Sequence, residues 1–256
     1  MIYDYDTLEI LDEKEVIVVT MNRAEKRNAL SNLMKEELTD VARTISKNTT
    51  CSCVILTANG PVFSAGNDIS EVDHLETVSL GEARKLVRLG ADLCEAWENL
   101  PSLTIAAVNG AAIGGGTSLA VACDFRILSP EAYFYAPEVE LGLTFSWNTL
   151  ARLGDLVGPA RAKLIGALSR KIDASTALEW GLCEELSEEP KITARGLAEE
   201  IKLKPRIAQQ MVKESVNRHF QSPNTAYLEQ DQILLSLLVG ESKRLHELKR
   251  RELATG

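Results

Sequence analysis

A strand that runs through a glycine-rich turn into a helix is the feature that most constrains this chain. The apolar run Leu103–Val108 predicts a buried strand, and the successive glycines Gly114–Gly116 open an apolar, helix-like run that ends at Asp124. A helix entered through glycines leaves backbone N–H groups free and aimed at one spot. Such a spot can hold an anion, or an oxygen that becomes an anion during a reaction. The alternative is a tight turn that needs only the backbone freedom of glycine.

A second segment repeats this design and favours the first of the two interpretations. Val54–Thr57 predicts another buried strand, and Asn59-Gly60-Pro61 is strong turn punctuation. The loop Phe63–Ile69 that follows is again rich in small residues. Two such loops could each donate one N–H group to a shared oxyanion.

The remaining pattern predicts an α/β fold. Further strands are expected at Val16–Met21 and Phe125–Leu128, and helices at Ser31–Lys47, with Ser31 as N-cap, and at Gly81–Asn99. The strand signal fades after about residue 145, and a helical part follows. Its expected helices are Pro159–Leu168, Ala174–Gly181, Thr193–Leu203, Arg206–Phe220 and Thr225–Val239. We therefore expect a mixed core over residues 1–195 and a helical C-terminal region over residues 196–256.

Composition excludes several classes of protein. The 28 basic and 37 acidic residues give a net charge of −9, which argues against a surface that binds nucleic acid. No apolar run reaches membrane-spanning length, and the acidic N-terminus lacks a secretory apolar region. The five cysteines and three histidines form no zinc pattern. Reduced core thiols in a cytoplasmic protein, with no metal, are the expectation.

An ordered set of motifs covers nearly the whole chain and resembles the crotonase family, also called the enoyl-CoA hydratase/isomerase family. The matching segments are Asn22–Leu30, Phe63–Ile69, Ala107–Asp124, Ala136–Leu143, Ala174–Leu182 and Met211–Asn217. The resemblance implies a spiral of β-β-α repeats, a helical C-terminal oligomerisation region, and a trimer or a dimer of trimers. It also implies an acyl-CoA thioester as substrate, with coenzyme A as part of that substrate and no separate cofactor.

The resemblance assigns the catalytic parts to three positions. The N–H groups of Asn67 and Gly115 are expected to hold the oxygen of a thioester enolate. Glu138 falls where the family has its catalytic glutamate, and a carboxylate in an apolar pocket has a raised pKa that suits proton transfer. An exposed glutamate at a strand end is the alternative for Glu138, and Glu140 is a minor second candidate for the acid/base.

Position 118 decides which reaction is expected. Two-carboxylate hydratases of this family have a second glutamate there, whereas this chain has Ser118, interpreted as a pocket-wall residue without a histidine partner. A single glutamate suits the double-bond shift of an enoyl-CoA isomerase. Hydration of a 2-enoyl-CoA and a non-catalytic acyl-CoA-binding role remain alternatives, and RNA binding is the weakest because the chain is acidic.

The substrate-binding residues are also taken from the resemblance. Phe145 and Trp147 are expected either to shape the acyl pocket or to pack in the core or at a subunit contact. Ser146 occupies the place where dehalogenases of the family have a nucleophilic aspartate, which argues against that reaction. The other expected contacts with CoA or the acyl group are Arg23, Lys26, Arg27, Ala29, Ala65, Asp68, Ile69, Gly114 and Ser118.

Overall fold

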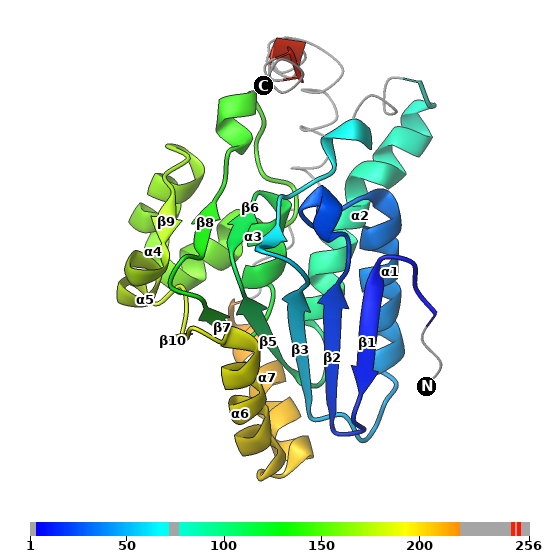
Figure 1. Ribbon diagram of the computed structural model, residues 1–256, viewed down its shortest axis with the longest axis vertical. Coiled ribbons are helices and arrows are strands. Elements are labelled where there is room, and N and C mark those ends of the chain that lie inside the picture. The colour runs from blue at the N-terminus through cyan, green and yellow to red at the C-terminus, as the bar shows by residue number, and fades with distance from the viewer. Residues whose placement is uncertain (1–3, 72–76, 221–246, 249, 252–256) are drawn as a thin grey trace.

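The larger of two sheets forms the centre of the protein (Figure 1). The computed structural model describes residues 4–71, 77–220, 247–248 and 250–251. The sheet has the strand order β1-β2-β3-β5-β7-β10 and is parallel except for β1, which pairs with β2 in antiparallel fashion. Its strands are β1 (Leu8–Asp12), β2 (Val16–Met21), β3 (Cys53–Ala58), β5 (Leu103–Val108), β7 (Phe125–Leu128) and β10 (Glu185–Leu186). Every residue of β2 and β3 is buried, as expected where helices cover both faces of a parallel sheet.

A smaller sheet confirms the spiral of β-β-α repeats. Its order is β4-β6-β8-β9, with strands β4 (Val62–Ser64), β6 (Ala111–Ile113), β8 (Tyr133–Tyr135) and β9 (Ile172–Asp173). Strands β3, β5 and β7 of the larger sheet are each followed by one strand of the smaller sheet and then by a helix, α2 (Leu80–Glu98), α3 (Gly115–Val121) and α4 (Thr149–Gly166) respectively. Each repeat therefore contributes one strand to the larger sheet, then one strand to the smaller sheet, and then a helix.

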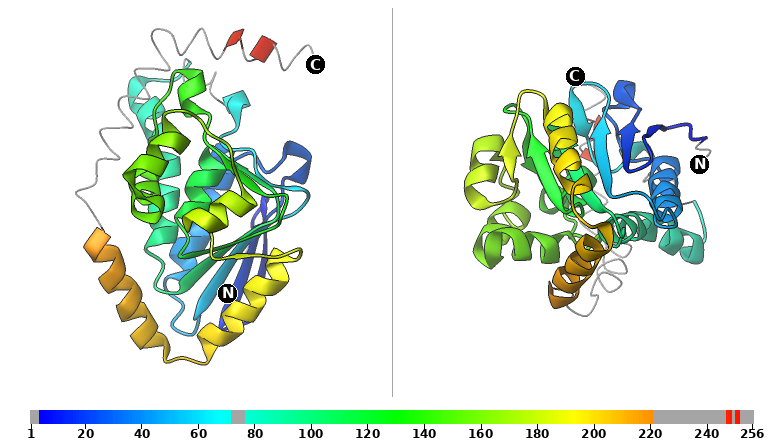
Figure 2. Two further views of the ribbon diagram at one scale, coloured as in Figure 1. Left: turned by 90° about the vertical axis from the view of Figure 1, so that its left-hand side faces the viewer. Right: turned by 90° about the horizontal axis from the view of Figure 1, so that it is seen from below.

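Helices cover the two faces of the larger sheet with separate apolar clusters. One cluster joins α1 (Asn32–Ile45) and α2 to one face through residues such as Met34, Leu38 and Trp97. The other joins α6 (Pro190–Lys202) to the opposite face, through Ala194, Ala198 and Ile201. Figure 2 shows α6 and α7 (Arg206–Phe220) beside this sheet. The predicted division after residue 195 falls inside α6, and residues on both sides of it pack on the sheet.

Several predicted elements have the expected boundaries. Ser31 is the N-cap of α1, and its Oγ accepts a hydrogen bond from the Met34 N–H at 3.2 Å. α5 (Ala174–Trp180) and α7 also lie where the sequence predicts them. The predicted helix Thr225–Val239 lies outside the described residues.

Other elements differ from the expectation after residue 145. The helix predicted at Pro159 begins earlier, at Thr149, because α4 continues through a break at Gly158, which has φ 80° and ψ 161°. The strand signal does not end there either, since β9 and β10 complete the two sheets with two residues each. Strands this short are held by pairing with longer neighbours and leave no periodicity to detect.

All five cysteines are free and buried, as expected for core thiols. In the described part of the chain, no helix has both the length and the apolar composition needed to cross a membrane.

Candidate active site

The two glycine-containing loops lie against each other. Gly66 has φ +87°, and a Cβ at this position would lie 2.7 Å from the Ile113 carbonyl oxygen and 3.4 Å from the Gly115 nitrogen. A side chain here would therefore push the loops apart. The sequence prediction that these two loops meet is confirmed.

Each loop presents one backbone N–H group that the protein itself does not use. Leu30 and Asn67 form a parallel bridge, in which the Leu30 N–H donates to the Gly66 oxygen and the Asp68 N–H donates to the Leu30 oxygen. This pattern leaves the Asn67 N–H without an acceptor in the described part of the chain. Gly115 is the first residue of α3, where helix geometry provides no acceptor, and none is found among the described residues.

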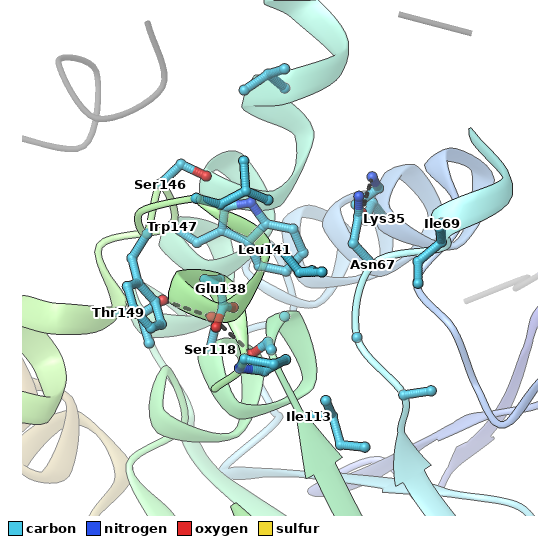
Figure 3. A pocket seen from close by; sticks show the side chains of 18 of the residues that line it. Lys35, Asn67, Ile69, Ile113, Ser118, Glu138, Leu141, Ser146, Trp147 and Thr149 are labelled. Carbon is cyan, nitrogen blue, oxygen red and sulfur yellow. Dashed lines mark hydrogen bonds between the residues drawn. The ribbon is translucent and has the colours of Figure 1, made fainter. Parts of the chain in front are cut away.

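Both residues line a cavity of about 190 Å³ (Figure 3). The cavity is mostly apolar, and residues from α1, α2, both loops and the segment before α4 form its wall. Of the residues predicted from sequence, it contains Ala65, Asn67, Ile69, Gly114, Gly115, Ser118, Glu138, Phe145 and Trp147. Of the others, Arg23, Lys26, Arg27, Ala29 and Asp68 do not line it.

Glu138 is the ionisable residue nearest to the glycine turn. It begins the 3-10 helix Glu138–Leu141, which ends at Gly142 in the left-handed conformation. A Cβ on Gly114 would lie 3.1 Å from Glu138 Oε1, so the carboxylate lies directly against the residue that precedes Gly115. Its Oε2 is buried and has no hydrogen-bond partner in the described part of the chain, and burial raises the pKa of Glu138 to about 7. The exposed-glutamate alternative is therefore wrong.

Ser118 lies beside Glu138, and the hydrogen bonds of its hydroxyl are already made. Its Oγ donates to the Gly114 oxygen at 3.2 Å and accepts from Thr149 Oγ1 at 2.6 Å. Only 2% of the residue is exposed, and it lines the cavity. Because its one proton is donated to a carbonyl, this serine forms part of the cavity wall, as the sequence predicts.

Trp147 and Phe145 both line the cavity and pack against the main apolar cluster. The Trp147 indole lies over two glycines, where a Cβ would approach it to 1.8 Å on Gly90 and 2.5 Å on Gly115. Phe145 is buried in the main apolar cluster and also lines the cavity. The Trp147 carbonyl accepts a hydrogen bond from Arg152 Nη1 at 2.6 Å, which fixes the loop from behind.

Comparison with known proteins identifies the family. A family model described as enoyl-CoA hydratase/isomerase matches residues 12–249. The chain belongs to the enoyl-CoA hydratase/isomerase family. It is 38% identical over 212 residues to a short-chain-enoyl-CoA hydratase of Clostridium acetobutylicum, covering 82% of this chain and 80% of that protein. It is 31% identical over 223 residues to the mouse mitochondrial Delta(3,5)-Delta(2,4)-dienoyl-CoA isomerase, covering 81% of this chain and 68% of the isomerase.

The solved structures confirm the fold. An enoyl-CoA hydratase/isomerase from Mycobacterium paratuberculosis superimposes with a TM-score of 0.88 over 96% of this chain and 99% of that one, at 23% identity. The resemblance stated from sequence is thus confirmed, and the protein is an enzyme of the hydratase/isomerase family.

Two of the predicted substrate contacts, Arg23 and Asp68, form an ion pair with each other, and their contact with the substrate stays a prediction. Arg23 Nη1 donates to the Ala29 oxygen at 2.7 Å and pairs with Asp68 Oδ2 at 3.1 Å. Asp68 Oδ1 accepts from the Ser70 N–H and Oγ, and these hydrogen bonds, together with Arg23, hold the pKa of Asp68 below its usual value although burial opposes them. The pair therefore ties the two loops together outside the cavity. Lys26 and Arg27 are exposed, and their contact with CoA stays a prediction.

Lys35 is a site residue that the sequence interpretation missed. It lines the cavity from α1 with only 4% of its surface exposed, and its Nζ donates to Asn67 Oδ1 at 2.9 Å. Burial lowers the pKa of Lys35 to about 8, although Glu71 and Asp68 oppose this shift. One signal could have revealed it: a lysine follows Met34 and precedes Leu38 by three residues, on the apolar stripe of a predicted helix.

Proposed function

We propose that this enzyme moves the double bond of a 3-enoyl-CoA through a thioester enolate, with Glu138 as its single acid/base. The observation that carries the proposal is the position of Glu138 Oε2, which has no hydrogen-bond partner among the described residues. It lies beside the glycine turn that bears the Gly115 N–H, for which these residues provide no acceptor either. A base with a pKa near 7 is half ionised at neutral pH, which suits both removal and return of a proton.

The proposed reaction needs one carboxylate and two N–H donors. The Glu138 carboxylate takes a proton from C2 of the 3-enoyl-CoA, and the electron pair left behind delocalises onto the thioester oxygen. The N–H groups of Asn67 and Gly115 stabilise that oxygen, and one such donor is typically worth about 3–4 kcal/mol. Protonated Glu138 then returns the proton to C4, which leaves a 2-enoyl-CoA and restores the carboxylate.

Among the described residues, the cavity wall provides one carboxylate besides Glu138, and this favours isomerisation over hydration. Position 118 is a serine with its hydrogen bonds made, and the other carboxylate of the cavity wall, Glu71, accepts from the Asn32 N–H at 2.7 Å on the Lys35 side. Addition of water to a 2-enoyl-CoA is the second candidate. The hydratase named among the relatives favours it, since this chain matches 80% of that protein's length.

Assembly and location are further proposals. The described part of α7 exposes the large apolar side chains Ile207, Met211, Val212 and Val216, and this supports a trimer or a dimer of trimers, as expected from the resemblance. Sedimentation analysis would contradict this proposal if the protein ran as a monomer. Five unpaired buried cysteines fit a reducing compartment, and we propose the cytoplasm.

A paired assay tests the reaction. The purified enzyme is given 3-hexenoyl-CoA and, separately, crotonyl-CoA, and the products are resolved by chromatography and mass spectrometry. Conversion of the 3-enoyl ester to its 2-enoyl isomer without a gain of 18 mass units on crotonyl-CoA is the expected result. Rapid hydration of crotonyl-CoA would overturn the isomerase proposal in favour of the hydratase, and inertness toward both esters would reject both reactions for these acyl groups.

A further inference from the structure

Lys35 is a buried cation, and no carboxylate among the described residues forms an ion pair with it. The described residues provide one hydrogen-bond acceptor for its ammonium group, the Asn67 side-chain oxygen at 2.9 Å. An ammonium group has three donors, so two stay unused. Burying a charge is costly unless it is paired and hydrogen-bonded, and this lysine is 96% buried with its amine at the wall of an open cavity.

Two carboxylates near Lys35, Asp68 and Glu71, accept hydrogen bonds from other groups. Asp68 is paired with Arg23 and accepts from Ser70, and Glu71 Oε2 accepts from the Asn32 N–H. Both raise the pKa of Lys35 through space, but neither forms an ion pair with it. The described carboxylates therefore compensate the positive charge of the ammonium group only in part.

Asn67 adds a second donor at the same place. Because an ammonium group can only donate, the Asn67 amide must turn its oxygen toward Lys35, and this leaves its NH₂ group without an acceptor among the described residues. Figure 3 shows these two side chains meeting on the side of the cavity away from Glu138. Lys35 and Asn67 together thus offer donors to an oxygen-bearing group inside an otherwise mostly apolar acyl pocket.

We propose that Lys35 and Asn67 form a recognition site for a carboxylate at the end of a short acyl group, so that the enzyme prefers acyl-CoA thioesters of dicarboxylic acids. A carboxylate accepts from both donors at once and supplies the missing counter-charge, and such charge-assisted hydrogen bonds are the strong ones. The acyl group is short because the Asn67 N–H, which is proposed to hold the thioester oxygen, belongs to the same residue. This inference rests on the proposed acyl-CoA site.

The test compares binding of unreactive saturated thioesters, so that it does not depend on which reaction the enzyme catalyses. Isothermal titration calorimetry measures Kd for glutaryl-CoA, pentanoyl-CoA and free CoA on the wild type, Lys35→Met and Lys47→Met. Lys47 is an exposed lysine just beyond α1, and its variant removes the same charge far from the cavity. Thermal melts check that each variant is folded; a neutral chain in place of an underpartnered buried charge should keep the fold.

The expected result is that the wild type and Lys47→Met bind glutaryl-CoA at least tenfold more tightly than pentanoyl-CoA. Lys35→Met should lose this preference and bind pentanoyl-CoA as well as the wild type does. Equal affinities of the wild type for the two thioesters would overturn the inference and leave the proposed function intact. An equal loss for CoA and both thioesters in Lys35→Met would place Lys35 at the CoA portion, which also overturns it. Failure of the wild type to bind any of the three ligands would reject both the inference and the acyl-CoA site.

Discussion

Two buried lysines in this enzyme have opposite surroundings. Lys213 on α7 is 6% exposed, and its Nζ donates to Asp124 Oδ2 at 2.7 Å and to the Ser102 oxygen at 3.1 Å. The same Asp124 oxygen also accepts from the N–H and Oγ1 of Thr104. Lys35, equally buried, has one amide oxygen as its partner.

The carboxylates of the two regions differ in the same way. Asp124 accepts from Lys213 and Thr104, whereas Glu138 Oε2 has no partner. An unpaired buried charge costs several kcal/mol, whereas the fold can retain a paired one at little net cost. We infer that the Asp124 cluster, formed by Asp124, Lys213 and Thr104, serves the fold. We infer that the unsatisfied groups of the cavity serve the substrate, because a bound ligand can supply the partners that the described residues do not.

The largest expected effect is on activity, and it distinguishes Glu138 from the neighbouring Glu140. Glu138→Gln should lower kcat for 3-hexenoyl-CoA about 10³-fold, within the range typical of general acid–base groups, because the amide cannot carry the proton. CoA binding should change little, since the variant keeps the size of the side chain. Steady-state kinetics measure the first effect and calorimetry the second.

Glu140→Gln is the matched control for this experiment. Glu140 lies two residues away, is exposed, and accepts a hydrogen bond from the Tyr135 hydroxyl at 2.7 Å. Its variant should keep activity close to that of the wild type. A Glu138→Gln enzyme with wild-type turnover would show that Glu138 is not the base.

The next largest effect is expected in the Asp124 cluster, on the free energy of unfolding. Lys213→Met leaves Asp124 without its cation and should lower the free energy of unfolding by on the order of 3 kcal/mol. Denaturant titration measures this loss, and Lys202→Met, which breaks an exposed pair with Glu199, should change little. A Lys213→Met protein as stable as the wild type would remove the distinction between the two regions.

A third experiment compares the effects of the two carboxylates, Glu138 and Asp124, on stability. Because the folded-state pKa of Glu138 is raised from 4.5 to about 7, its ionised form destabilises the fold above pH 7 by up to about 3 kcal/mol. Glu138→Gln should therefore be more stable than the wild type at pH 8, and the difference should shrink as the pH falls through 7 and vanish below about 4.5. Asp124→Asn should be less stable at pH 8. Losses of stability of similar size in Glu138→Gln and Asp124→Asn would contradict this difference between the two carboxylates.

Much of the site could be predicted from the sequence because its parts are local. Glycine turns between apolar strands and helices mark the two loops, and the resemblance assigns Asn67, Gly115 and Glu138. The sequence could not show that Gly66 brings the two loops into contact, that Oε2 of Glu138 has no partner, or that Arg23 is held by Asp68. These facts depend on how distant segments meet in space.

Lys35 escaped prediction because two rules conflict at its position. Helical periodicity places it on the buried stripe of α1, whereas its residue type predicts solvent exposure. The short strands β4, β6, β8 and β9 escaped for another reason: their two or three residues are stabilised by sheet partners and carry no alternation of their own. A residue whose type conflicts with its place in the periodic pattern is therefore a candidate for a functional role.

The pH dependence of kcat/KM for 3-hexenoyl-CoA tests the central claim most directly, since it reports ionisation of the essential base in the free enzyme. The dephospho-CoA thioester, which lacks the titrating 3′-phosphate, is assayed in parallel. For both substrates we predict activity that is constant above about pH 7 and falls about tenfold per unit below it, because protonated Glu138 cannot accept the C2 proton. A profile that stays flat down to pH 5 would contradict the claim that the desolvated carboxylate of Glu138 is the base.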